Sequence, residues 1–289
     1  MPQPHVRPVV LLILDGWGVA QPSRSNPYTI AKLPRYDDLV AHYPAMTLQA
    51  SGESVGLPWG EMGNSEVGHM NLGSGKIVYQ SLPRINRAIA DGSFVTNAAF
   101  LSAIENAKQK KSRLHLLGLV SSGGVHSFNE HAYALLELAK QHGLTDVFFH
   151  AFLDGRDTPS KSAENFIGKL QTHITEVGIG AIATLSGRFW GMDRDNRWER
   201  EEKAYRAMVF GEATERGPDP LALIRASYAK GVLDEEFAPT VITDAAGKPV
   251  GNIQDGDSVI TFNFRPDRMR QLTKAFVLPG FEKFNRGAY

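Results

Sequence analysis

The hydrophobic and polar positions along the chain follow two patterns that take turns. Short continuous apolar runs, typical of strands buried in a parallel sheet, are separated by stretches in which apolar residues recur at the period of an α-helix. The predicted strands are residues 9–14, 113–120, 146–152, 181–185 and 257–263. Amphipathic helices are predicted over residues 97–110 and 162–177.

This alternation predicts an α/β fold in which a mainly parallel sheet is flanked by helices. The pattern is interrupted after the first predicted strand and begins afresh beyond residues 75–80. We therefore predict two domains, over residues 1–77 and 78–289. A chain of 289 residues, 42% of them hydrophobic, can bury a sizeable core and is long enough for two domains.

Charge and cysteine content exclude several functional classes. Lys plus Arg and Asp plus Glu each number 31, so no net field draws the whole chain to nucleic acid or to an anionic membrane. The absence of cysteine excludes a disulfide framework and thiolate catalysis. The first residues carry no typical signal peptide, and residues 9–14 are far too short to span a bilayer. We expect a cytoplasmic protein with small-molecule partners, without nucleic-acid or membrane partners.

Candidate chemistry begins at residues 63–75, where Ser65 stands among four glycines with Glu66 and His69 close by. Glycines let a phosphate or a metal approach the backbone, and a serine hydroxyl needs an activating neighbour to attack at neutral pH. This composition predicts a nucleophile loop. A Gly- and Ser-rich surface turn is the alternative.

A second candidate, Asp15, ends the first predicted strand. Open α/β sheets place their ligands at the carboxyl ends of strands, and a carboxylate oxygen there suits Mg²⁺ or Mn²⁺. The alternative for Asp15 is an Asx turn that leaves the strand.

Together these segments resemble the cofactor-independent phosphoglycerate mutases, whose metal-binding half belongs to the alkaline phosphatase superfamily. Further blocks that resemble this family follow in the family's order, at residues 119–127, 150–159, 187–200 and 263–268. Two residues depart from the family's pattern: Ser122 and Phe128 stand where an acidic residue and a histidine are more usual.

The later blocks share guanidinium groups beside the predicted strand ends. Arginine offers a planar fork that binds carboxylate and phosphate in a bidentate manner, and a phosphoglycerate bears both groups. The predicted substrate-binding arginines are Arg156, Arg188, Arg194, Arg265 and Arg268. For each of them, a solvated surface position or a structural salt bridge is the alternative.

Arg265 and Arg268 are the stronger candidates among these arginines. Pro266 suits the first turn of a helix, and arginines three residues apart share a face at the amino end, which attracts anions. Arg197 is left outside the predicted site because it could equally pair with Glu201, four residues further on.

Proton transfer requires one further group, because the accepting hydroxyl of glycerate must lose a proton. The candidates are Asp157 and His126, which the residues themselves do not rank. The resemblance implies Asp157 as general base and His126 as a substrate contact, with Asp157 also among the substrate-binding residues.

For the whole chain, the resemblance implies part of an alkaline-phosphatase-like domain followed by an inserted α/β phosphotransferase domain. It implies a monomeric isomerase that interconverts 3-phosphoglycerate and 2-phosphoglycerate in glycolysis and gluconeogenesis. The reaction would pass through a phosphoserine at Ser65 and need no 2,3-bisphosphoglycerate. The complete site would hold two Mn²⁺ or Mg²⁺ ions, with Asp15 and Ser65 among their ligands.

The family's remaining metal ligands are Asp and His residues further along the chain than the phosphotransferase domain. Here the last of the nine histidines is His173. We therefore expect an amino-terminal fragment that is inactive alone. The alternatives are a phosphatase-like or sulfatase-like hydrolase of the same superfamily, or a truncated chain that binds phosphorylated acids without catalysis.

Overall fold

In the computed structural model, which describes residues 8–287, the chain separates into two units, Met1–Pro83 and Arg84–Tyr289. Helix α4 (Ser81–Ala90) crosses the boundary between them. Among the described residues, no helix combines the length and the apolar character that a membrane span requires.

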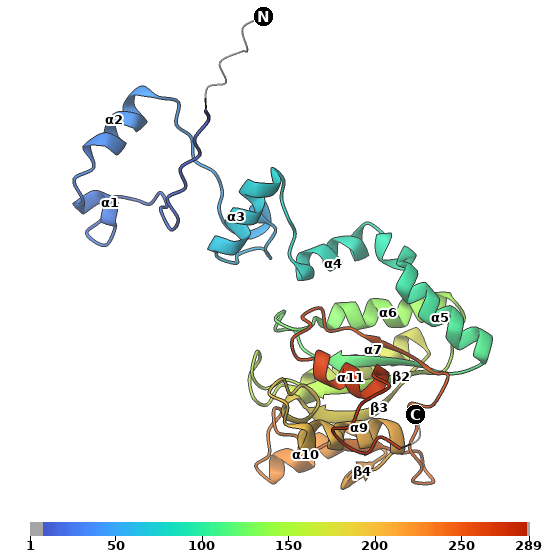
Figure 1. The fold of residues 1–289 in the computed structure, drawn as a ribbon. Coiled ribbons are helices and arrows are strands. Elements are labelled where there is room, and N and C mark those ends of the chain that lie inside the picture. The colour runs from blue at the N-terminus through green and yellow to red at the C-terminus, as the bar shows by residue number, and fades with distance from the viewer. Residues whose placement is uncertain (1–7, 288–289) are drawn as a thin grey trace, which may run out of the picture. The chain divides into compact units, whose positions relative to one another are not determined.

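The second unit is built on one six-stranded sheet with the order β4-β5-β3-β2-β1-β6. Figure 1 labels β2, β3 and β4 of this sheet. Its strands are β1 (Leu114–Leu119), β2 (Val147–Leu153), β3 (Ala181–Gly187), β4 (Glu215–Gly217), β5 (Thr240–Ile242) and β6 (Ser258–Thr261). Every neighbouring pair is parallel except β3 and β5. The predicted mainly parallel α/β sheet is confirmed.

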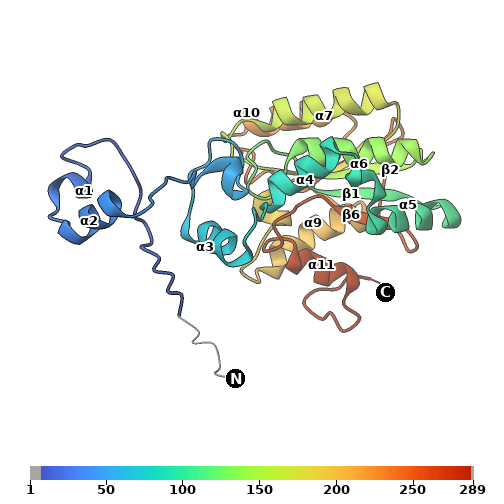
Figure 2. The same cartoon turned by 90° about the horizontal axis from the view of Figure 1, so that it is seen from above.

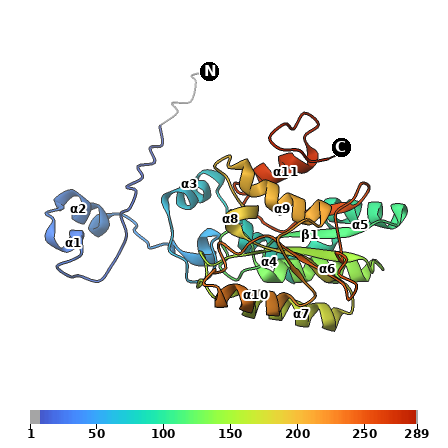
Figure 3. The ribbon, with the colours of Figure 1, turned by 90° about the horizontal axis from the view of Figure 1, so that it is seen from below.

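Helices cover both faces of this sheet (Figures 2 and 3). One face carries α5 (Ala98–Lys110), α6 (Asn129–Gln141), α7 (Ala163–Val177) and α10 (Pro220–Ala229). The opposite face carries α9 (Trp198–Phe210) and α11 (Arg270–Val277). The short elements η2 (Ser93–Thr96) and α8 (Arg188–Gly191) precede α5 and α9. The connections β1–α6–β2–α7–β3 are the crossovers that parallel strands require.

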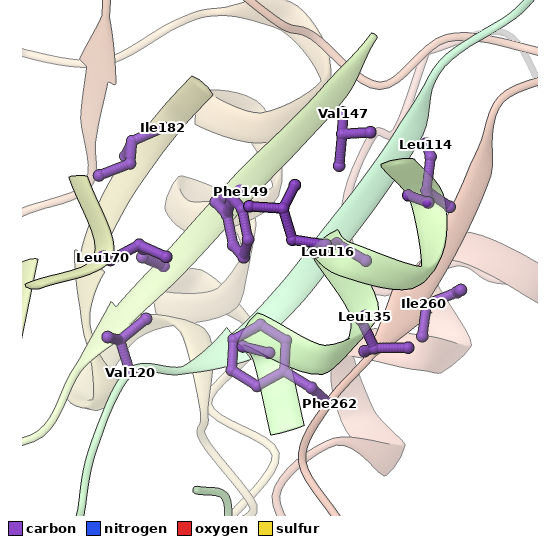
Figure 4. Close-up of a cluster of buried hydrophobic side chains, with 14 of the residues drawn as sticks. Leu114, Leu116, Val120, Leu135, Val147, Phe149, Leu170, Ile182, Ile260 and Phe262 are labelled. Atoms are coloured by element: carbon purple, nitrogen blue, oxygen red, sulfur yellow. The ribbon is translucent and has the colours of Figure 1, made fainter. Parts of the chain in front are cut away.

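The core lies on both faces because successive side chains of a strand point to opposite sides. Leu116 and Phe149 meet Leu135 of α6 on one face (Figure 4), whereas Leu117 and Phe152 pack on the other. Burial of each such side chain contributes about 1.5–3 kcal/mol. The sheet is therefore a rigid base for the loops that leave it.

The sequence pattern correctly predicts the four strands β1, β2, β3 and β6 and the two helices α5 and α7. The ends differ by only a few residues; α5, for example, begins at Ala98 because the side chain of Asn97 accepts hydrogen bonds from two backbone amides of its first turn. Strands β4 and β5 were missed, since each is only three residues long.

The first unit contains helices but, within residues 8–83, no strand. Its elements are α1 (Pro27–Ile30), α2 (Pro34–His42), η1 (Gly52–Val55) and α3 (Ser65–Ser74). The predicted strand over residues 9–14 is wrong for this structure: Val9 is 96% exposed and Leu12 is 78% exposed. A strand needs a neighbouring strand for its backbone hydrogen bonds, and this part of the chain offers none.

Candidate active site

The predicted substrate-binding side chains follow four adjacent strands of the sheet. His126 follows β1; Arg156 and Asp157 follow β2; Arg188 and Arg194 follow β3; Arg265 and Arg268 follow β6. All four strands run parallel, so their carboxyl ends meet at one edge. The structure therefore gathers the predicted residues where α/β sheets bind ligands.

Strands β2 and β3 lie on one side of β1 and β6 lies on the other, so β1 and β6 form a topological switch point. Backbone hydrogen bonds connect the loops that follow these two strands. The backbone oxygen of His126 accepts hydrogen bonds from the amides of Phe264, at 2.9 Å, and Arg265, at 3.3 Å. A crevice at such a switch point is the usual ligand position in open α/β sheets. These two hydrogen bonds place His126 beside the arginines of the loop that follows β6.

Asp154 is a site residue that the sequence analysis missed. Its Oδ1 accepts a hydrogen bond of 2.7 Å from Nη1 of Arg188, and the side chains of Arg188 and Asp154 are 2% and 0% exposed. The same nitrogen of Arg188 donates to Oδ2 of Asp157 at 2.6 Å. Two carboxylates thus fix one guanidinium, and together they raise the pKa of Arg188 although burial opposes this.

Asp154 also shapes the turn that carries its neighbours. Its Oδ1 accepts hydrogen bonds from the backbone amides of Arg156 and Asp157, at 3.1 and 3.0 Å, and its Oδ2 accepts one of 2.5 Å from Ser121. Gly155 completes the turn with a φ of +69°. Burial raises the pKa of Asp154, but these hydrogen bonds and Arg188 outweigh it and lower the pKa. A polar residue at the end of an apolar strand was the available signal.

Asp267 lies between two arginines of the site, Arg194 and Arg265. Its Oδ2 accepts a hydrogen bond of 2.8 Å from Nη1 of Arg194, and its Oδ1 lies 3.2 Å from Nε of Arg265. Nδ1 of His126 is 3.5 Å from the same Oδ1. Burial raises the pKa of Asp267, but the arginines and His126 lower it further than burial raises it.

His126 is a neutral imidazole at physiological pH. Burial is the main reason that its pKa falls to about 4, and the positive charge of Arg188 lowers it further. Asp267 and Asp157 act in the opposite direction but do not compensate. His126 therefore offers the site one N–H donor and one lone pair rather than a positive charge.

Arg268 shows how closely the guanidinium groups gather. Its Nη1 donates to the backbone oxygen of Met192 at 3.0 Å, whereas its buried Nε has no hydrogen-bond partner. Burial lowers its pKa, and repulsion from Arg188, Arg194 and Arg156 lowers it further. Several like charges held within range of one another favour binding of a multivalent anion.

Arg156 lies at the margin of this group. Its side chain is 57% exposed, and its Nη1 is 3.4 Å from Oε1 of Glu235. A pair so open to solvent contributes little to stability. The guanidinium is therefore free to exchange its partner for an anionic ligand.

One local expectation was wrong. Pro266 does not begin a helix: residues 267–269 form a turn, and α11 begins at Arg270. The pair between Arg197 and Glu201, which the sequence left open as an alternative, does not form, since neither carboxylate oxygen of the buried Glu201 has a hydrogen-bond partner. Burial instead raises the pKa of Glu201 to about 9, helped by Asp193.

In the first unit, Ser65 and Asp15 lie in contact. The hydroxyl of Ser65 donates a hydrogen bond of 2.8 Å to Oδ2 of Asp15, and Nδ1 of His69 is 3.2 Å from the same hydroxyl. The expected nucleophile loop is largely a helix, because Asn64 caps the amide of Val67 and Ser65 begins α3. The amino end of a helix favours negative charge on a group bound there.

The two proposed metal ligands fit the predicted ions in kind. Oxygen donors such as the carboxylate of Asp15 and the hydroxyl of Ser65 are what Mg²⁺ and Mn²⁺ prefer. However, no group of three or more His, Asp or Glu side chains suited to a metal occurs in the described part of the chain. Such ions prefer about six ligands, and Asp15 and Ser65 alone do not supply that number.

Comparison with known proteins identifies the family of the chain. The sequence profile of the family described as "BPG-independent PGAM N-terminus" matches residues 85–289, which is most of the chain. The chain belongs to this family. Among its relatives are the 2,3-bisphosphoglycerate-independent phosphoglycerate mutase of Moorella thermoacetica, 52% identical over 280 residues, and the corresponding mutase 1 of Methanosarcina barkeri, 53% identical over 280 residues.

The family's fold is also seen in a solved structure. The chain is similar to the Leishmania mexicana phosphoglycerate mutase crystallised at low cobalt concentration, with a TM-score of 0.75 and 34% identity over 95% of this chain and 52% of that one. Both relatives named above match 97% of this chain but only 54% of their own length. The chain thus spans about half the length of the curated relatives that it matches.

Proposed function

We propose that this member of the family takes part in the interconversion of 3-phosphoglycerate and 2-phosphoglycerate in glycolysis and gluconeogenesis. The reaction proceeds through a phosphoserine at Ser65 and needs no 2,3-bisphosphoglycerate. The observation that supports this most directly is the group of arginines at the carboxyl edge of the sheet, one of them fixed by Asp154 and Asp157 and two of them joined by Asp267.

The arginines match both charged groups of a phosphoglycerate. Arg194 and Arg265 already share one carboxylate, that of Asp267, so their donors point towards a common anion. A phosphate or a carboxylate of the substrate can take the place of that carboxylate and accept hydrogen bonds from both guanidinium groups. Arg188 cannot turn because it is buried and bonded to two carboxylates, so we assign it to the other end of the substrate together with Asp157, whose side chain is 16% exposed.

Ser65 acts as the nucleophile that accepts and returns the phosphoryl group. Asp15 accepts the hydroxyl proton in a hydrogen bond of 2.8 Å, which fixes the position of Oγ. Asp15 and Ser65 would also help to hold two Mn²⁺ or Mg²⁺ ions. Such ions lower the pKa of a bound hydroxyl and neutralise charge on a phosphoryl group.

Asp157 serves as general base for the accepting hydroxyl of glycerate. Nη1 of Arg188 lies 2.6 Å from Oδ2 of Asp157, which fixes the orientation of the carboxylate. The side chain of Asp157 is 16% exposed, so the carboxylate remains accessible to a ligand. A positioned base contributes about 10²–10⁴ in rate. His126, neutral and buried beside Arg265, contacts the substrate through its ring.

The test is a mutase assay of the full-length protein in the absence of 2,3-bisphosphoglycerate. Ser65→Ala should lower turnover by several orders of magnitude and abolish the phosphoserine detected by mass spectrometry. Ser74→Ala, at the other end of α3, is the matched control and should leave turnover unchanged. More than a few percent of activity in Ser65→Ala would contradict the assignment.

A further inference from the structure

Two buried polar atoms close to Arg194 and Arg265 face each other without forming a hydrogen bond. Nδ1 of His126 and Oδ1 of Asp267 are each buried and each lack a hydrogen-bond partner. The distance between them is 3.5 Å, a few tenths of an ångström beyond a normal bond. Buried polar atoms are costly when unsatisfied, so a small movement that joins this pair is favourable.

The contacts of Asp267 with two arginines explain why its Oδ1 and Nδ1 of His126 do not form a hydrogen bond in this structure. Oδ2 of Asp267 accepts from Arg194 at 2.8 Å, and Arg265 lies 3.2 Å from Oδ1, on the oxygen that also faces His126. Both arginine side chains are nearly half exposed, at 44% and 47%, and are therefore able to move. An anion that binds them removes the competition for Asp267.

We propose that Asp267 is a positioning residue for His126. When an anion engages Arg194 and Arg265, Asp267 accepts a hydrogen bond from Nδ1–H of His126 and fixes the imidazole in the tautomer whose Nε2 carries the lone pair. The inference rests on the proposed function, because the anion is the phosphate or the carboxylate of phosphoglycerate.

This tautomer decides what His126 recognises. A lone pair on Nε2 accepts a hydrogen bond, so it suits the hydroxyl of glycerate and not an anionic oxygen, which needs a donor. The arginines would then bind the phosphate and the carboxylate of the substrate, while His126 contacts its hydroxyl group. The other charged groups near the ring are Arg188, Asp157 and Arg265.

The experiment observes the tautomer of His126 directly, by long-range ¹H–¹⁵N NMR of the 289-residue chain labelled at histidine. The His126→Gln spectrum assigns the signal. Spectra are recorded free, with inorganic phosphate and with 3-phosphoglycerate. With either anion bound, the wild type should favour the Nδ1–H form by roughly tenfold, the preference given by one hydrogen bond.

The variant Asp267→Asn reverses the expected preference, because its amide can donate to Nδ1 and stabilise the Nε2–H form. Asp267→Ala should leave a mixture of both forms. Glu212→Gln is the matched control: Glu212 also pairs with an exposed arginine, Arg206, and its replacement should not change the spectrum of His126. Retained amide dispersion shows that each variant is folded.

The outcomes separate this inference from the proposed function. If phosphate binds and sets the tautomer but 3-phosphoglycerate does not bind, the inference stands and the proposed substrate is wrong. If 3-phosphoglycerate binds and the tautomer is the same in wild type and Asp267→Asn, the inference is wrong and the substrate stands. If neither anion binds, both are contradicted, because Arg194 and Arg265 then do not form an anion site.

Discussion

Nη1 of Arg188 lies 2.7 Å from Oδ1 of Asp154, and both side chains are shielded from solvent. This pair connects the ends of two neighbouring strands, since Asp154 follows β2 and Arg188 follows β3. A buried guanidinium is tolerated only when it is paired and hydrogen-bonded. The contact therefore holds the site together as well as orienting one of its arginines.

Replacement of Asp154 by alanine should accordingly destabilise the second unit. The change leaves Arg188 with a single, partly exposed partner, and removal of one member of a buried ion pair costs about 3–5 kcal/mol. Urea unfolding followed by tryptophan fluorescence measures the loss. The control is Glu212→Ala, which removes a carboxylate from an exposed pair with Arg206 and should cost less than about 1 kcal/mol. Equal costs in both variants would show that burial of the Arg188 pair is unimportant.

Glu201 is expected to lower stability at neutral pH. Burial raises its pKa from the usual 4.5 to about 9, so the folded state holds a proton that the unfolded state releases. Above pH 4.5 the unfolded state therefore binds fewer protons, and stability falls as pH rises towards 9. Glu201→Leu should raise the free energy of unfolding at pH 7 by about 1–3 kcal/mol.

The pH dependence distinguishes this effect from simple packing. The gain from Glu201→Leu should be larger at pH 8 than at pH 5, because the penalty of Glu201 grows across that interval. Denaturant midpoints at both values provide the comparison. Glu202→Leu, at a neighbouring and partly exposed position, is the control. A gain that is independent of pH would argue against a protonated buried carboxyl.

Lysine in place of Arg265 or Arg268 should weaken the binding of 3-phosphoglycerate. A lysine keeps the charge but cannot supply the planar fork, and loss of a charge-assisted hydrogen bond costs about 1.5–3 kcal/mol, or roughly tenfold or more in affinity. Isothermal titration calorimetry measures the change. Arg225→Lys, which affects only an exposed pair with Glu164, should bind as the wild type does. Wild-type affinity in both site variants would place Arg265 and Arg268 outside the site.

Manganese should bind the first unit only weakly. Asp15 and Ser65 are in contact but supply two oxygen ligands, and a cation held by one carboxylate and water binds weakly, with a dissociation constant above about 10⁻³ M. Titration of Mn²⁺ followed by electron paramagnetic resonance tests this, with Asp15→Ala expected to remove the residual binding. Asp37→Ala, on α2, is the control. Tight binding would reveal ligands that the described contacts do not show.

The sequence predicted the second unit well because its signals are local. Apolar runs located four strands, and parallel pairing then placed the residues after them at one edge. It did not reveal Asp154 or Asp267 as partners of the arginines. Those contacts depend on which strands are neighbours and on how each loop turns, and Asp154 and Arg188 are 34 positions apart in sequence.

The first unit shows the limit of a local signal. Residues 9–14 have the composition of a buried strand, but a strand forms only beside a partner, and residues 8–83 provide none. At Ser65, the glycines suggested a loop, whereas the capping side chain of Asn64 and the following residues form a helix. The contact between Ser65 and Asp15, 50 positions apart, nevertheless joins the two residues that the sequence had singled out.

The proposed phosphoglycerate site is tested most directly by titration of 3-phosphoglycerate into the ¹⁵N-labelled 289-residue chain, followed by amide chemical shifts. Saturable shifts are expected in the four segments that follow the strands at the carboxyl edge of the sheet, at residues 121–127, 154–157, 188–194 and 263–268. Absence of binding, or shifts confined to other parts of the second unit, would contradict the claim that these arginines form a phosphoglycerate site.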